Sequence, residues 1–195
     1  MPADLVRAGC DKAEVEALRR HHFYRRPIAL IPNGVPADSF AETPRAGLRV
    51  PGEPVIASVS EWYSLKNPKM LFKAFKLVRE QVPGARLFVF GHGFQPAGPA
   101  EHYARSIGVS EGVTYFGYSR PETVRHVLGS QADIYFHPTL EESFGMTFIE
   151  AMALGLPCVG GRASGAIPWI LGDGQAGLLA DVRNAREVAD GLLHL

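Results

Sequence analysis

The sequence has little that would tie the chain to a metal, a nucleic acid or a membrane. Its only two cysteines, Cys10 and Cys158, lie far apart and match no metal-ligand spacing. Lysine and arginine (20) balance aspartate and glutamate (20), so no net charge attracts polyanions. No apolar run approaches the roughly 20 residues of a membrane span, and the N-terminus lacks the apolar core of a secretion signal. These absences predict a soluble protein of the reducing cytoplasm, with no nucleic-acid partner and no metal.

What the sequence does have is a regular alternation of apolar segments with glycine- and proline-rich turns. Residues 1–53 differ from the rest, because a helical stretch around Val15 and Leu18 is followed by a short strand at 28–35 and a Pro/Gly-rich segment. We interpret residues 1–53 as a lead-in that contains a helix and a connecting segment. Residues 54–195 form the second unit and are long enough to bury a single core.

Within residues 54–195, strand-like and helical runs follow one another as a repeated βα unit. Strands are predicted at 54–60, 85–91, 113–117, 132–138, 157–161 and 176–180. Helices are predicted to begin near residues 67, 100, 121, 145 and 184. The strand runs are apolar at consecutive positions, which is typical of parallel strands covered by helices on both faces. The sequence therefore predicts an α/β fold with an open, doubly wound parallel sheet, whose ligands bind at the carboxyl ends of the strands.

The segment 137–161 carries the strongest functional signal. Glu142 and Glu150 are eight residues apart across a Phe-Gly step that opens a helix, so their carboxylates are separated by about 10 Å. Two carboxylates at that distance suit the hydroxyls at both ends of an extended ligand, while free N–H groups near Phe144, Gly145 and Met146 suit an anionic middle. A nucleotide-sugar has that shape. The alternative is that Glu142 only favours the helix dipole and Glu150 is a solvated helix residue.

This segment resembles the donor-binding motif of the retaining GT-B glycosyltransferases related to glycogen synthases, sucrose synthases and mannosyltransferases. The matching residues of the E-x7-E motif are Glu142, Phe144, Gly145, Glu150, Ala151, Met152, Ala153, Gly155 and Pro157. The resemblance implies a Rossmann-like domain that is one half of a GT-B fold. It also implies that an N-terminal acceptor domain is missing, that any membrane contact comes through that domain or the acceptor, and that the chain alone transfers nothing.

The resemblance also assigns roles to individual residues. It implies that Glu150 binds the ribose hydroxyls, that Glu142 faces the hydroxyls of the transferred sugar, and that Phe144, Gly145 and Met146 lie near the diphosphate or sugar. In LKNP at 65–68, Lys66 matches the family lysine that neutralises the diphosphate. The substrate is then a nucleoside diphosphate sugar, with no cofactor and no metal. Without the resemblance, the alternative interpretation is that Lys66 is a solvated loop lysine.

One departure from the family pattern concerns the phosphate site. Relatives carry Gly-Arg ahead of the lysine loop, with the arginine as a second phosphate ligand, whereas this chain has Ser60-Glu61. A carboxylate there would repel a diphosphate, so we expect Glu61 to face solvent or pair with a cation. Arg162, just past the strand at 157–161, is our candidate for the substitute cation.

Three further residues have two interpretations each. His92, with Gly93, ends the strand FVFGHG, which resembles the family's base-side strand, and it either contacts the donor or belongs to a short turn. His137 either touches the sugar or only ends its strand. Trp169 is expected in the core, with a sugar or base contact as the alternative.

Three function classes fit the sequence to different degrees. The first is the donor-binding half of a retaining glycosyltransferase, and the second is a nucleotide-binding module without transfer activity. The third is another GT-B chemistry, such as nucleotide-sugar epimerisation or pyridoxal-dependent phosphorolysis, which E-x7-E disfavours. Hydride transfer is disfavoured because no G-x-G-x-x-G run with a following acid is present after the first strand.

Overall fold

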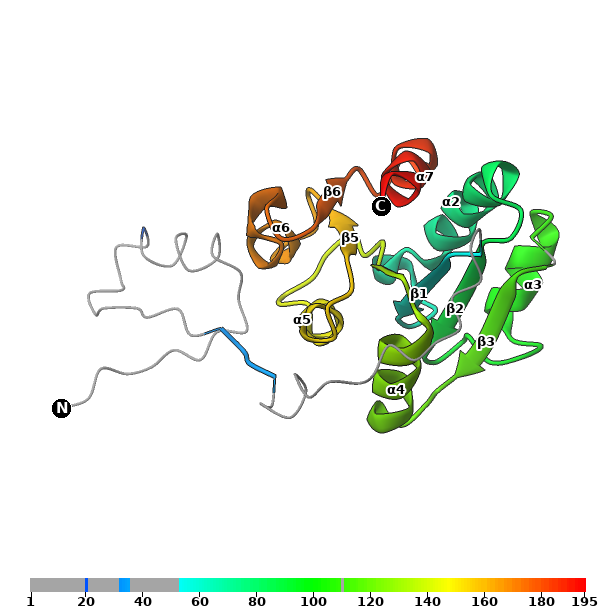
Figure 1. Ribbon diagram of the computed structural model, residues 1–195, viewed down its shortest axis with the longest axis horizontal. Helices are drawn as coiled ribbons and strands as arrows, with labels where there is room; N and C mark the ends of the chain where they lie inside the picture. Colours follow the sequence, from blue (N-terminus) through cyan, green and yellow to red (C-terminus); the bar gives the residue numbers. More distant parts are fainter. Residues whose placement is uncertain (1–19, 21–31, 36–52, 110) are drawn as a thin grey trace.

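The computed structural model describes residues 20, 32–35, 53–109 and 111–195 (Figure 1). The predicted helix around Val15 and the first half of the predicted strand at 28–35 lie outside these described residues, and the described residues 32–35 form no strand. The proposed boundary between a lead-in at 1–53 and a domain at 54–195 stays a prediction.

The domain is built on one parallel sheet of six strands in the order β3-β2-β1-β4-β5-β6. The strands are β1 (Val55–Val59), β2 (Arg86–Phe90), β3 (Val113–Gly117), β4 (Ile134–Phe136), β5 (Cys158–Gly161) and β6 (Leu178–Ala180). Every strand was predicted from the sequence, and the doubly wound parallel sheet is confirmed. The six-stranded order is the one found in dinucleotide-binding α/β folds.

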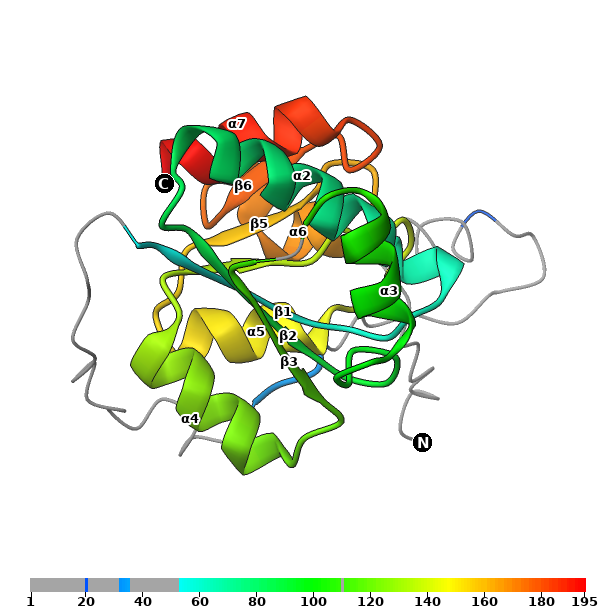
Figure 2. The same cartoon turned by 90° about the vertical axis from the view of Figure 1, so that its right-hand side faces the viewer.

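Helices cover both faces of the sheet (Figure 2). One face packs against α2 (Pro68–Gln81), α3 (Pro99–Ser106) and α7 (Ala185–His194). The opposite face packs against α4 (Pro121–Gln131), α5 (Met146–Ala153) and the short α6 (Ile167–Ile170). None of the described helices is long and apolar enough to cross a membrane.

Strand β2 shows why its residues are apolar at consecutive positions. Leu87 and Val89 point into the core on the α2 and α3 side, whereas Phe88 and Phe90 point into the core on the α4 and α5 side. Since successive side chains of a strand alternate between faces, a strand covered on both sides needs apolar residues throughout.

Three short helical elements were not predicted. They are the 3-10 turns η2 (Ser64–Lys66) and η3 (Gly172–Gly174) and the four-residue helix α6. Elements of three or four residues are too short to show a helical period, so hydrophobic patterning does not reveal them. The turn η2 carries Lys66, one of the predicted site residues.

The strand order creates a crevice between β1 and β4. From β1 the chain proceeds outward through β2 and β3, and then β4 begins on the other side of β1 and continues through β5 and β6. The crossovers on the two sides of this switch point diverge, so the carboxyl ends of β1 and β4 stay uncovered by a connecting helix. This is where a ligand site is expected.

The core on the α2 side offers a test of the fold. Phe75 of α2 is 1% exposed, and Phe72 stacks on Phe94 in the same cluster. We expect Phe75→Ala to lower the free energy of unfolding by roughly 3 to 5 kcal/mol through lost burial and a cavity. The exposed Lys73 of the same helix is the control, and Lys73→Ala should change stability by no more than about 0.5 kcal/mol. Urea unfolding followed by circular dichroism measures both, and equal effects would contradict this packing.

Candidate functional site

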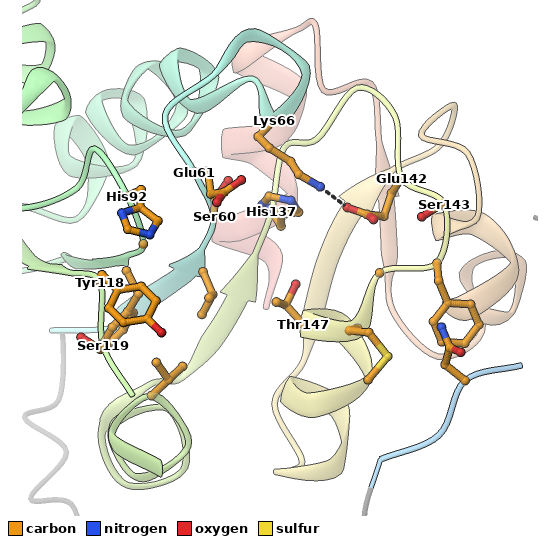
Figure 3. Close-up of a pocket in the computed structure, with 18 residues that line it drawn as sticks. Ser60, Glu61, Lys66, His92, Tyr118, Ser119, His137, Glu142, Ser143 and Thr147 are labelled. Carbon is orange, nitrogen blue, oxygen red and sulfur yellow. Dashed lines mark hydrogen bonds and ion pairs between the residues drawn. The ribbon is translucent and has the colours of Figure 1, made fainter. Parts of the chain in front are cut away.

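A pocket with a volume of about 480 Å³ opens at the carboxyl ends of β1, β2, β3 and β4 (Figure 3). Its lining comes from the residues that follow these strands and from the loop that leads into α5. The polar and charged members are Asn33, from the described segment 32–35, and Ser60, Glu61, Lys66, His92, Tyr118, Ser119, His137, Glu142, Ser143 and Thr147. The pocket therefore lies at the switch point of the sheet, as the strand order requires.

An ion pair crosses the pocket between two loops. The Lys66 Nζ lies 2.6 Å from Glu142 Oε2, and the two side chains are 19% and 16% exposed (Figure 3). Because the pair is only partly screened by water, its charges interact more strongly than a surface pair does. The structure thus joins the two residues that the sequence predicted to be catalytic.

Lys66 is held by the backbone around it. The turn η2 ends at Asn67, whose left-handed conformation (φ 51°) starts α2 and whose Nδ2 donates to the Val182 carbonyl at 2.8 Å. The Leu140 N–H donates to the Leu65 carbonyl at 2.9 Å. These bonds anchor the lysine loop to the loop after β6 and to the loop after β4.

Glu142 is held from the opposite side by the loop between β5 and α6. The Ala166 N–H donates to the Glu142 carbonyl at 2.9 Å, and the buried Ser164 hydroxyl donates to the Thr139 carbonyl at 2.6 Å. Gly165 has φ +58°, and a Cβ there would lie 2.3 Å from the Glu142 carbonyl oxygen. Only glycine permits this close approach, so the β5–α6 loop fixes the backbone of Glu142.

The N-terminus of α5 faces the same pocket. Gly145 precedes the helix with φ +88°, and no side chain caps the helix. Among the described residues, no acceptor is found for the N–H groups of Met146 and Thr147. Unpaired N–H groups and the positive end of the helix dipole favour a bound anion.

His137 lies at the end of β4 and is 2% exposed. Its ring packs against Phe148 with centroids 6.0 Å apart, and its Nδ1 is buried without a hydrogen-bond partner among the described residues. Burial, with a smaller contribution from the Lys66 charge, lowers the pKa of His137 to about 3. The imidazole is therefore neutral near pH 7.

Glu150 lies in an adjoining pocket of about 180 Å³. The two pockets share the residues Val59, Ser119 and Val124. Glu150 is exposed at its surface, yet desolvation by the neighbouring atoms raises the pKa of its carboxyl, against the opposing effect of Arg125. Both predicted carboxylates are thus available to one extended ligand, at separate positions along it.

An aromatic pair forms the far wall of the pocket. The His92 ring stacks on Tyr118 with centroids 5.0 Å apart and an interplanar angle of 21°. Tyr118 is 72% exposed, so its ring is open to a planar ligand group. Tyr118 was not among the predicted site residues. It directly follows the predicted strand at 113–117, and this position at a strand end is a signal that could have singled it out.

Most of the predicted site residues line the pocket or the adjoining pocket. Lys66, His92, Glu142, Phe144, Gly145 and Met146 line the pocket, and Glu150 lines the adjoining one. Gly93 and Arg162 line neither pocket.

The reasons for these two differences are local. Gly93 packs against Trp62, and a Cβ there would lie 2.2 Å from the Trp62 Cβ. The Arg162 guanidinium is turned toward α7, where it pairs with Glu187 and lies 3.4 Å from the Leu179 carbonyl oxygen. Arg162 is therefore not placed as the substitute phosphate ligand.

Glu61 was expected either to face solvent or to pair with a cation. It is exposed, but it lines the pocket that Lys66 also lines, and within the described chain it forms no ion pair (Figure 3). The pocket therefore contains two carboxylates, Glu61 and Glu142, and one ammonium group, Lys66.

The expectation for Trp169 was that it lies in the core. Trp169 is half-buried rather than central, and it packs edge-on against Phe144 at 5.9 Å. In the part of the chain that the structure describes, no three His, Cys, Asp or Glu side chains are grouped to hold a metal ion.

Comparison with known proteins places this geometry in a family. The family of glycosyl transferases group 1 matches residues 39–195. D-inositol 3-phosphate glycosyltransferase of Segniliparus rotundus is 32% identical over 180 residues, which cover 86% of this chain and 39% of that protein. The corresponding protein of Nocardia farcinica is 31% identical over 179 residues, with the same coverage. The chain therefore spans less than half the length of these two relatives.

Solved structures show the same architecture. WaaG, a glycosyltransferase involved in lipopolysaccharide biosynthesis, superimposes with a TM-score of 0.72 at 20% identity, covering 94% of this chain and 51% of WaaG. Sucrose-phosphate synthase from Thermosynechococcus elongatus gives a TM-score of 0.69 at 25% identity, covering 95% and 47%. The chain belongs to the glycosyl transferases group 1 family and has the fold of one half of a GT-B glycosyltransferase.

Proposed function

We propose that this chain binds the nucleoside diphosphate sugar of a retaining glycosyltransferase, and that a separate N-terminal domain binds the acceptor. The observation that carries the proposal is the convergence of Lys66, Glu142 and the unpaired N–H groups of α5 on one pocket. A cation, a hydroxyl acceptor and an anion-binding helix end match the parts of a sugar diphosphate. The isolated chain would bind the donor without transferring the sugar.

In this proposal the diphosphate lies between Lys66 and the N-terminus of α5. The Lys66 ammonium and the N–H groups of Met146 and Thr147 bind its oxygens, and Glu142 accepts hydrogen bonds from the sugar hydroxyls. The ion pair already holds the Lys66 ammonium at the pocket, so little side-chain entropy is lost when the ligand binds.

The transfer step needs charge stabilisation rather than a nucleophile from this chain. The bond between the anomeric carbon and the diphosphate oxygen breaks as the acceptor hydroxyl attacks the same face of the sugar. The leaving diphosphate takes the acceptor's proton and is stabilised by Lys66 and α5. We propose no metal and no cofactor for this step, and a cytoplasmic location for the protein.

The nucleoside part extends toward the adjoining pocket. Glu150 accepts hydrogen bonds from the two ribose hydroxyls, and the base stacks on the exposed Tyr118 ring. Val59, Ser119 and Val124 border both pockets and so connect the ribose position with the diphosphate position.

The diphosphate position is tested by a ligand series. We expect affinity to rise from uridine to UMP to UDP, with GDP and ADP compared in parallel, and to fall as salt screens Lys66. Lys66→Met should weaken diphosphate binding about tenfold or more and leave nucleoside binding unchanged, since a hydrogen bond to a charged group contributes about 1.5 to 3 kcal/mol. Lys69→Met, on the exposed side of α2, is the control. Equal calorimetric affinity for nucleoside and diphosphate would show that the phosphate site is misplaced.

The ribose position is tested at Glu150. Glu150→Gln should weaken ribonucleotide binding about tenfold and abolish the preference over the 2′-deoxynucleotide, because charge-assisted bonds to the hydroxyls are lost. Glu141→Gln, exposed and outside both pockets, is the control. Burial raises the pKa of the Glu150 carboxyl, so as the pH falls this carboxyl should become protonated at a higher pH than an ordinary glutamate does. Ribonucleotide binding should weaken over that pH range in the native protein but not in Glu150→Gln. Unchanged ribonucleotide affinity in Glu150→Gln would indicate that Glu150 is only a solvated helix residue.

A second candidate function is nucleotide binding without transfer, and the position of Glu61 favours it. Like-charge repulsion between Glu61 and a diphosphate costs on the order of 1 kcal/mol at partly solvated separations. If the pocket serves an ordinary diphosphate donor, Glu61→Gln should tighten UDP binding about fivefold and Glu61→Arg more strongly. Uridine affinity serves as the internal control in the same titrations. Weaker UDP binding by Glu61→Arg would favour nucleotide binding without transfer over the donor-binding function.

A further inference from the structure

His137 carries a polar group that no part of the described chain satisfies. Its ring is 2% exposed, and Nδ1 is enclosed without a donor or an acceptor beside it. Buried polar atoms in native proteins nearly always have a partner, and an unpaired one costs stability. A phenylalanine would fill the same space beside Phe148 without that cost, so the choice of histidine needs a functional reason.

The second ring nitrogen supplies the reason. Nε2 also has no hydrogen bond within the described chain, but it is not among the enclosed atoms, and His137 lines the pocket. A neutral imidazole carries one proton, and that proton is more stable on the nitrogen that can reach water or a ligand. With its proton on Nε2, His137 would present a donor to the pocket and keep a bare Nδ1 in the interior.

The surroundings of His137 define what this donor can bind. The Lys66 ammonium is close enough for its charge to act on the imidazole, and Figure 3 shows His137 between Glu61 and Lys66. Lys66 is itself paired with Glu142. A ligand oxygen that reaches Lys66 would therefore also come near His137. A neutral donor at this place adds a hydrogen bond without adding a second cation that would repel Lys66.

We propose that His137 donates a hydrogen bond from Nε2–H to a phosphate oxygen of the bound diphosphate, beside the Lys66 ammonium. This inference rests on the proposed function and deepens it, because it adds a neutral phosphate ligand at the floor of the pocket. It also implies an exchange of stability for binding: the buried Nδ1 stays unpaired and costs stability, while Nε2–H of the same ring binds the diphosphate.

The experiment compares His137→Phe and His137→Gln in the 195-residue chain. Phenylalanine keeps the ring packing and removes both nitrogens, whereas the glutamine amide can reach the position of Nε2. Thermal unfolding measures stability, and calorimetry measures binding of UDP, GDP and ADP and of the matching nucleosides. We expect His137→Phe to unfold at an equal or higher temperature yet bind the diphosphate about tenfold more weakly, with nucleoside affinity unchanged. His137→Gln should recover most of the diphosphate affinity.

Two outcomes would overturn the inference while leaving the proposed function in place. In the first, His137→Phe binds the diphosphate as tightly as the native chain. In the second, it loses stability together with affinity for nucleosides and diphosphates alike, which is the signature of a packing role. If the native chain binds none of the three diphosphates, the proposed function fails and the role of His137 fails with it.

Discussion

The site depends on one backbone hydrogen bond, from the Leu140 N–H to the Leu65 carbonyl. It joins the loop after β1 to the loop after β4, two segments that are far apart in the sequence and adjacent only because β1 and β4 are neighbours. Lys66 follows the acceptor directly, and Glu142 comes two residues after the donor. The bond therefore helps to set the distance across which the ion pair between Lys66 and Glu142 closes.

Around this bond, the chain leaves several polar groups unsatisfied. Among the described residues, the Ser60 hydroxyl, His137 Nδ1 and the first N–H groups of α5 have no partner and belong to residues that line the pocket. The buried Ser58 hydroxyl also has no partner, but Ser58 does not line the pocket. A bound ligand would supply partners for the Ser60 hydroxyl and the N–H groups of α5, whereas His137 Nδ1 stays enclosed in the interior. The aromatic core on both faces of the sheet provides the stability that tolerates them.

The sequence predicted the sheet well because its signal is local. Each strand is a short apolar run between turns, so its existence does not depend on a distant contact. The site was predicted where a motif fixed the spacing, as for Glu142, Gly145 and Glu150. Arg162 was misjudged because a strand-end position does not show which way a side chain turns, and Glu187 attracts it toward α7. His137 stayed ambiguous because burial and partner loss are tertiary properties.

The charges of the pocket indicate how it would hold an anion. With two carboxylates against one ammonium, Coulomb attraction alone does not favour a diphosphate. The favourable terms must come from oriented neutral donors: the N–H groups of α5 and the imidazole of His137. The fold fixes the orientation of these dipoles, and the neighbouring carboxylates do not neutralise them. A second cation, in contrast, would be neutralised by those carboxylates. Salt would then weaken binding only through Lys66, and the specificity of the pocket for phosphate would lie in donor geometry rather than in net charge.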